Sequence, residues 1–134
     1  MKSIPEKHMV RKKQIFHKEL SFEVVGCAYK VHRTLGPGFP EGVYHKALCY
    51  ELINAEIPFE SEKAIEVFHD GKICGEFRAD LVVDNKIVLE LKALEELNGN
   101  HISQAVSYLK ATRLKLAILI NFGTENLETQ RVIL

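Results

Sequence analysis

Two apolar runs near the middle of the chain carry charged residues at positions where a buried strand would have none. The first is RADLVV at residues 78–83, and the second is KIVLELKA at residues 86–93. An ionised group in a strand core is costly unless it is paired or binds a metal. The two runs contain the carboxylates of Asp80 and Glu90 and the ammonium group of Lys92. These charges could therefore be paired with each other or could bind a metal.

The segment between the two runs predicts a hairpin that brings their charged residues close together. It contains Asp84-Asn85, a dipeptide typical of tight hairpin turns. A hairpin would bring Asp80 close to Glu90 on the adjacent strand. Side chains two residues apart on a strand share a face, so Glu90 and Lys92 lie together on a face that we expect to be solvated. The leucines on either side of Glu90 are expected to face the core.

The charges suit a hard divalent cation such as Mg²⁺, which binds carboxylate oxygens, backbone carbonyls and water. Asp80, Glu90 and the carbonyl of Leu91 are therefore candidate ligands. A lysine beside a metal can orient a water molecule or stabilise charge on a phosphate during hydrolysis, and Lys92 is the candidate. The plainer alternative is an exposed strand edge, because a Glu-x-Lys triplet also arises by chance in a chain that is 27% charged.

Length and composition limit the class of protein. A chain of 134 residues suits one domain with its own core. We expect a flexible basic segment at residues 1–13 and a single domain at residues 14–134. No apolar stretch approaches the roughly 20 residues of a membrane span, and no leader pattern is evident, so we expect a cytoplasmic protein that does not contact membranes.

Cysteine content and net charge narrow the chemistry further. Cys27, Cys49 and Cys74 are far apart and odd in number, so neither a disulfide framework nor a zinc site is indicated, and we expect buried, reduced thiols. The formal net charge of zero argues against a strong nonspecific grip on nucleic acid.

Periodicity and turn residues predict an α/β protein, a layered sheet with helices packed against it, in the order ααβββαββ. A strand, helix, strand crossover should make the strand after the third helix parallel to the third strand. The expected helices span residues 15–35, 40–55 and 101–112, and the expected strands span residues 57–68, 73–83, 86–93, 114–120 and 129–133.

Five further polar residues are candidates for the site. Glu41 falls in the first turn of the second helix, and Tyr44 lies one turn later on the same side. His101, Gln104 and Tyr108 form a polar stripe on the third helix, beside its apolar face. Each has a structural alternative: interaction with the helix dipole for Glu41, packing for Tyr44, and an ordinary polar boundary for the stripe.

One motif, Gly38-x-x-Glu41-x-x-Tyr44, closely resembles the signature that names the GxxExxY family, which is assigned to the PD-(D/E)XK nuclease superfamily. The resemblance runs from about Phe22 to the C-terminus, in the family's order and spacing. It continues through Gly75-Glu76-Phe77-Arg78-Ala79-Asp80, Glu90-Leu91-Lys92, His101-x-x-Gln104-x-x-x-Tyr108 and Asn121-Phe122-Gly123.

This resemblance implies a restriction-endonuclease-like core, a central mixed β-sheet flanked by α-helices, that binds Mg²⁺ or Mn²⁺. By position, Asp80 and Glu90 look like the superfamily's metal ligands and Lys92 like its catalytic lysine. Glu41 looks like the additional acid that completes the metal shell from an early helix. The implied activity is that of a hydrolase, a metal-dependent nuclease that cleaves phosphodiester bonds of DNA or RNA.

The remaining matched positions imply less. Gln104 and Tyr108 resemble a Gln-x-x-x-Tyr pair that supports the site or contacts the nucleic acid. Arg78 and His101 match family positions without an assigned role, and Ala79 stands where the superfamily's name has proline, which affects backbone shape and spares the ligands. The alternative function is a catalytically silent module that binds nucleic acid or a protein partner through the same cleft. A homodimer or an unidentified protein partner fits either function.

Overall fold

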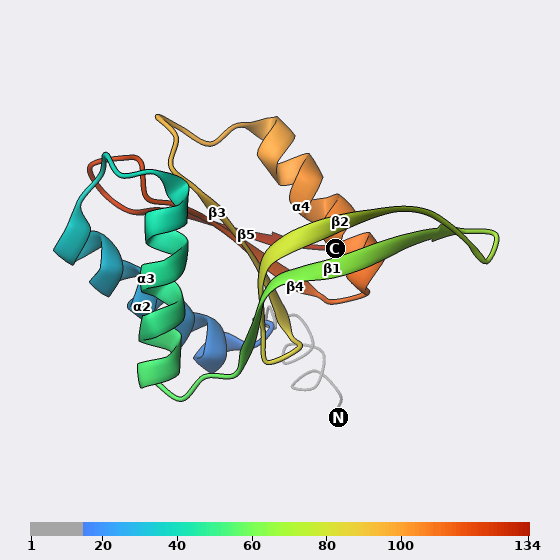
Figure 1. Cartoon of the computed structure of the whole chain (residues 1–134), viewed down its shortest axis with the longest axis horizontal. Helices are drawn as coiled ribbons and strands as arrows, with labels where there is room; N and C mark the ends of the chain where they lie inside the picture. Colours follow the sequence, from blue (N-terminus) through green and yellow to red (C-terminus); the bar gives the residue numbers. More distant parts are fainter. Residues whose placement is uncertain (1–14) are drawn as a thin grey trace, which may run out of the picture.

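A five-stranded sheet with helices on both faces forms the part of the chain that the computed structural model describes, residues 15–134 (Figure 1). The segment predicted to be flexible and basic, residues 1–13, lies outside the described residues. The predicted order ααβββαββ and the α/β class are confirmed. The elements are α2 (Lys18–Leu35), α3 (Glu41–Asn54), β1 (Phe59–His69), β2 (Lys72–Val83), β3 (Ile87–Lys92), α4 (Gly99–Thr112), β4 (Leu116–Asn121) and β5 (Glu128–Ile133).

The sheet is mixed, with the strand order β1-β2-β3-β4-β5. β3 and β4 are parallel, as predicted, and are joined through α4, whereas the other neighbouring strands are antiparallel. Both predicted hairpin turns are present. Asp84 and Asn85 have φ values of 49° and 51°, and Asp70 and Gly71 have φ values of 49° and 75°. Two successive positive φ values are what the type I′ hairpin turn requires.

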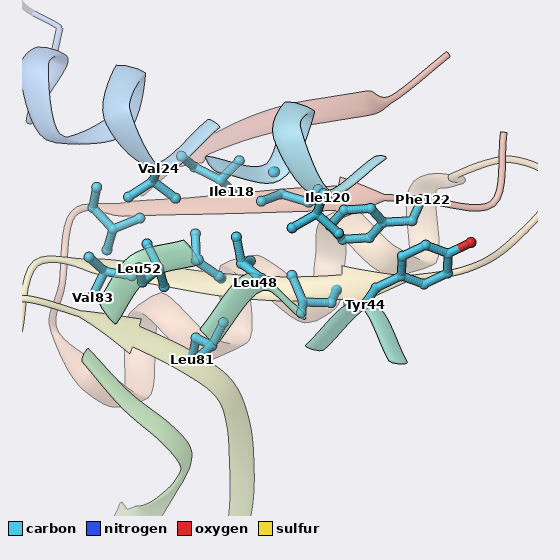
Figure 2. Packing of buried hydrophobic residues seen from close by; sticks show 14 of the residues in the cluster. Val24, Tyr44, Leu48, Leu52, Leu81, Val83, Ile118, Ile120 and Phe122 are labelled. Carbon is cyan, nitrogen blue, oxygen red and sulfur yellow. The ribbon is translucent and has the colours of Figure 1, made fainter. Parts of the chain in front are cut away.

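Two hydrophobic cores lie on opposite faces of the sheet, and β3 contributes to both. Leu89 and Leu91 pack with α2 and α3 in the larger core, part of which Figure 2 shows. Val88 packs with Ala105 of α4 in the smaller core. The expectation of a solvated face around Glu90 is therefore wrong, because α4 covers that face and leaves Glu90 only 3% exposed.

The ends of the helices follow from their capping residues. Gly36 ends α2 with a φ of 69° and donates its backbone N–H to the His32 carbonyl. Asn98 begins α4 through a capping box, in which its side chain accepts from the backbone of Asn100 and its backbone N–H donates to Nδ1 of His101 at 3.0 Å. This cap explains why α4 begins two residues before the predicted boundary.

The cysteines are less buried than expected. Cys74 is exposed near the end of the β1–β2 hairpin, and Cys27 and Cys49 are partly buried. The prediction of buried thiols is thus wrong for Cys74, because this end of the hairpin extends beyond the layers that cover the sheet (Figure 1). Within residues 15–134, no helix combines the length and the apolar character needed to cross a membrane.

Candidate active site

The alternation of side chains along β2 is interrupted at Asp80. Ala79 packs in the core on the α4 side, whereas Leu81 packs in the core on the side of α2 and α3, although residues two apart normally share a face. The ladder between β1 and β2 includes no pair at Asp80. The residue of β1 that lies opposite, Glu62, has a left-handed φ of 52°. Arg78 donates from Nη1 to the Glu62 carbonyl at 3.0 Å. Asp80 therefore lies at an irregularity that both strands share.

At this irregularity β2 and β3 are held together by side chains of acids. The backbone ladder pairs Leu81 with Leu89 and includes no pair beyond it on this side. The backbone N–H of Leu91 donates to Oδ2 of Asp80 at 2.7 Å, and the N–H of Asp80 donates to Oε1 of Glu90 at a longer 3.4 Å. Each acid thus accepts a hydrogen bond from the opposite strand, and the two carboxylates are held close together, as the predicted hairpin required.

The electrostatics of the pair show an excess of negative charge. Burial, with the charge on Asp80 adding to it, raises the pKa of Glu90 to about 8. Burial also raises the pKa of Tyr108 to about 12, and the charges on Glu90 and Asp80 contribute because they disfavour a phenolate. Neither acid of the pair belongs to an ion pair among the described residues. A bound cation would relieve this charge.

Glu41 and Lys92 lie in the same electrostatic environment at longer range. The pKa of Glu41 is raised, first because its carboxyl is partly screened from water and second because of the charge on Asp80, while Lys92 opposes the shift. Lys92 is half-buried at the end of β3 and forms no ion pair within the described part of the chain. In residues 15–134, no three His, Cys, Asp or Glu side chains gather closely enough to hold a metal ion. The arrangement is a close carboxylate pair with a more distant third acid.

Tyr44 lies in the core, with its ring among the residues that Figure 2 shows. Its hydroxyl donates to the Gly36 carbonyl and accepts from the backbone N–H of Phe39 at 3.1 Å. Both partners belong to the loop between α2 and α3. Tyr44 therefore fixes the loop that leads to Glu41.

The other predicted residues are distributed around α4 and the outer face of β2. Tyr108 is stacked on Phe77, with 4.2 Å between ring centroids, and the charges on Glu90 and Asp80 add to the effect of burial on its pKa. Gln104 is exposed one turn before Tyr108. His101 caps α4, and Arg78 is exposed and bonded to the Glu62 carbonyl. The structure thus brings Tyr108 near the acids and gives His101 and Arg78 backbone partners elsewhere.

Asn121 is a residue of this region to which sequence reasoning assigned no role. It is fully buried at the end of β4. Its Oδ1 accepts from the backbone N–H of Leu94 at 2.9 Å and of Gly123 at 3.1 Å, and its Nδ2 donates to the Leu94 carbonyl at 3.1 Å and to Oε1 of Glu128 at 3.0 Å. A polar residue directly after a continuous apolar strand was the available signal.

The residues that follow Asn121 hold the same end of β3. Phe122 donates its backbone N–H to the Lys92 carbonyl at 2.8 Å. Gly123 packs so tightly that a Cβ atom there would lie 2.4 Å from backbone atoms of Leu94. Together, Asn121, Phe122 and Gly123 fix the chain immediately after Lys92.

The described geometry agrees with comparisons to known proteins. A model of the PD-(D/E)XK nuclease superfamily matches residues 18–132. Among curated proteins, none matches this chain. A solved structure titled "Crystal structure of SSO0001" is similar with a TM-score of 0.56 and 23% identity, over 69% of this chain and 48% of that one, so this chain corresponds to about half of that protein. At this identity the likeness supports the fold alone.

The predicted restriction-endonuclease-like core is therefore confirmed. The superfamily model extends over most of the chain and includes the three helices and nearly all of the five strands that residues 15–134 form. It also includes the acid pair, Lys92 and Glu41. The chain belongs to the PD-(D/E)XK nuclease superfamily.

Proposed function

We propose that this protein is a divalent-metal-dependent nuclease of the GxxExxY family that hydrolyses phosphodiester bonds of nucleic acid. The observation that carries the proposal is the pair of Asp80 and Glu90. The two carboxylates are held together where β2 and β3 part, and burial and mutual repulsion raise the pKa of Glu90 to about 8. Keeping two acids together in this way is costly unless a cation joins them.

The donor set fits Mg²⁺ or Mn²⁺. These cations take oxygen ligands, and Mg²⁺ is usually bound by one or two protein carboxylates, with water completing the shell. Asp80 and Glu90 supply two carboxylates. We assign the Leu91 carbonyl and Glu41 as further ligands, and the response of the Glu41 pKa to Asp80 supports the latter. A site with two close acids is compatible with this chemistry although no third acid is adjacent.

The residues around the pair suit hydrolysis of a phosphodiester. A bound divalent cation would stabilise negative charge on the phosphate and make water a better nucleophile. Lys92 would donate hydrogen bonds to the attacking water or to a non-bridging phosphate oxygen. The water oxygen would form the new bond to phosphorus and give up a proton to solvent, the bond to the leaving oxygen would break, and the leaving oxygen would take up a proton from solvent. Tyr108 and Gln104 would support the site or contact the nucleic acid.

A catalytically silent binding module is the second candidate, and two observations favour it. The described residues contain no cluster of three potential metal-ligating side chains, and the formal net charge of the chain is zero. In this case the region around the acid pair would bind nucleic acid or a protein partner without turnover. The two candidates differ in what Glu90 must do, because a silent module does not require a cation there.

Titration calorimetry of Mg²⁺ and Mn²⁺ into the wild type and Glu90→Gln tests the proposal. The same samples are then incubated with single- and double-stranded DNA and RNA. Glu76→Gln is the matched control, since Glu76 is an exposed acid on β2. The nuclease proposal expects metal binding and metal-dependent cleavage in the wild type and in the control, and neither in Glu90→Gln. Wild-type protein that binds no metal would overturn it in favour of the silent module.

A further inference from the structure

A groove lies between the β1–β2 hairpin and α4, next to the candidate active site. The hairpin extends alongside α4 and past it (Figure 1). The groove encloses about 550 Å³. Its walls include Phe68 and Phe77 from the hairpin and Gln104, Tyr108, Lys110 and Arg113 from α4 and its C-cap.

Aromatic rings form much of this groove. Phe77 and Tyr108 are stacked face to face with 8° between their planes, so each ring covers one face of the other and the stack joins the hairpin to α4. Phe68 stands on the hairpin wall and is 58% exposed, although it is a large apolar side chain. Exposed aromatic faces of this kind are where proteins stack unpaired bases.

The charge in the groove is suited to phosphate. Lys110 and Arg113 line it, and neither belongs to an ion pair in the described part of the chain. Glu66 is the acid in the lining, but the preceding residue, Ile65, packs against the core on the α4 side. By strand alternation the Glu66 carboxylate belongs to the opposite face of the sheet. There Glu66 lies opposite Glu76 in the register of β1 and β2. The groove therefore presents cations to its contents.

Tyr108 connects the groove to the acids. It lines the groove, and it packs against the same core as Val88, which lies on β3 two residues before Glu90. Ala79, the neighbour of Asp80, packs in the same core as Phe77. A chain lying along the groove would therefore reach the acid pair at the Tyr108 end.

We propose that this groove binds a single-stranded segment of nucleic acid, with a base stacked on the exposed ring of Phe68, the chain lying beside the Phe77–Tyr108 stack, and phosphates beside Lys110 and Arg113. Bases in a duplex already stack on each other, so an aromatic surface selects an unpaired strand. Delivery of that strand to Asp80 and Glu90 rests on the proposed nuclease function. Binding itself does not, because no residue of the acid pair is needed for stacking or for neutralising phosphate.

Fluorescence anisotropy of the full chain in EDTA tests this inference, because cleavage is then absent. The probes are a short labelled DNA strand, the same sequence as RNA, and the DNA duplex. We expect both single strands to bind more tightly than the duplex, and Phe68→Ala to weaken single-strand binding by about tenfold. Lys110→Glu should weaken binding to a similar extent and reduce its dependence on salt. Lys46→Glu, an exposed lysine on α3, is the control and should bind as the wild type does.

The outcomes separate the groove from the nuclease proposal. Glu90→Gln should retain single-strand binding in EDTA even where it abolishes cleavage. Single-strand binding that depends on Phe68, in a protein that never cleaves, would support the groove and contradict the nuclease. Tighter binding of the duplex, or single-strand binding that neither Phe68→Ala nor Lys110→Glu weakens, would overturn the groove whatever the cleavage assay shows. Self-association that Phe68→Ala abolishes, without oligonucleotide binding, would instead assign Phe68 to a protein interface.

Discussion

The ring of Tyr44 lies parallel to that of Phe122, with 4.7 Å between their centroids and 7° between their planes (Figure 2). Tyr44 lies in the first turn of α3, three residues after Glu41, and its hydroxyl is bonded to the loop before this helix. Phe122 follows β4, and its backbone is bonded to the Lys92 carbonyl. The stack therefore connects the helix that carries Glu41 with the strand that carries Lys92.

Removing only the hydroxyl of Tyr44 should destabilise the protein. Tyr44→Phe keeps the stack on Phe122 but leaves the Gly36 carbonyl and the Phe39 N–H without this partner. We expect a loss of about 1–3 kcal/mol in the free energy of unfolding, measured by urea denaturation. Tyr50→Phe is the control, since Tyr50 is 56% exposed, and should change stability by less than about 0.5 kcal/mol. Equal stability of Tyr44→Phe and the wild type would mean that these hydrogen bonds are unimportant.

Asp80→Asn should leave the metal-free protein as stable as the wild type or make it more stable. The substitution removes the repulsion between Asp80 and Glu90 and keeps an oxygen that can accept from the Leu91 N–H. Thermal melting in EDTA measures the effect. A large loss of stability would mean that the hydrogen bond from the Leu91 N–H to the charged carboxylate outweighs the repulsion, and would count against a cation site. The same variant should lose the stabilisation that Mg²⁺ or Mn²⁺ gives to the wild type.

The stability of the metal-free protein should fall as the pH rises. The pKa of Glu90 is about 8 in the folded protein and is close to the ordinary value of a glutamate carboxyl, 4.5, when the chain is unfolded. The folded state therefore binds this proton more tightly, so its contribution is fully present below about pH 4.5 and is lost as the pH rises through about 8. Urea denaturation of wild type and Glu90→Gln across this range measures the difference. A wild type whose pH dependence is no steeper than that of Glu90→Gln would contradict the raised pKa.

Local sequence signals predicted the order of the elements, the hairpin at Asp84-Asn85 and the closeness of Asp80 to Glu90, because turn chemistry and strand period act over a few residues. The burial around Glu90 was not predictable in this way. It arises because α4, the next element along the chain, packs over that face, and side-chain alternation within a strand cannot reveal which face the following helix covers. The left-handed conformation of Glu62 was equally hidden, because glutamate gives no signal for a positive φ.

Gly123→Ala should be strongly destabilising. A Cβ atom at this position would lie 2.4 Å from Leu94 backbone atoms, so the chain after Lys92 would have to move. We expect a loss of about 1–3 kcal/mol or more, together with weaker metal binding, by urea denaturation and calorimetry. Gly26→Ala is the matched control. It lies within α2 with no atom in reach of the new methyl group, and should stabilise the protein by up to about 1 kcal/mol. Wild-type stability in Gly123→Ala would contradict the tight packing.

Lys92→Met should separate binding from catalysis. Lys92 is half-buried and forms no ion pair among the described residues, so methionine, an unbranched apolar side chain of similar length, should preserve the fold. Removing its positive charge from beside Asp80 and Glu90 should leave metal affinity equal or slightly higher, as calorimetry would show.

If Lys92 stabilises the attacking water or the phosphate, metal-dependent cleavage should fall by about 10²-fold or more. Lys86→Met, at the β2–β3 turn where Lys86 pairs with Asp84 at the surface, is the control and should cleave normally. Undiminished cleavage in Lys92→Met would show that the lysine has no part in the chemistry, whereas a joint loss of metal binding and cleavage would make it a structural residue of the cation site.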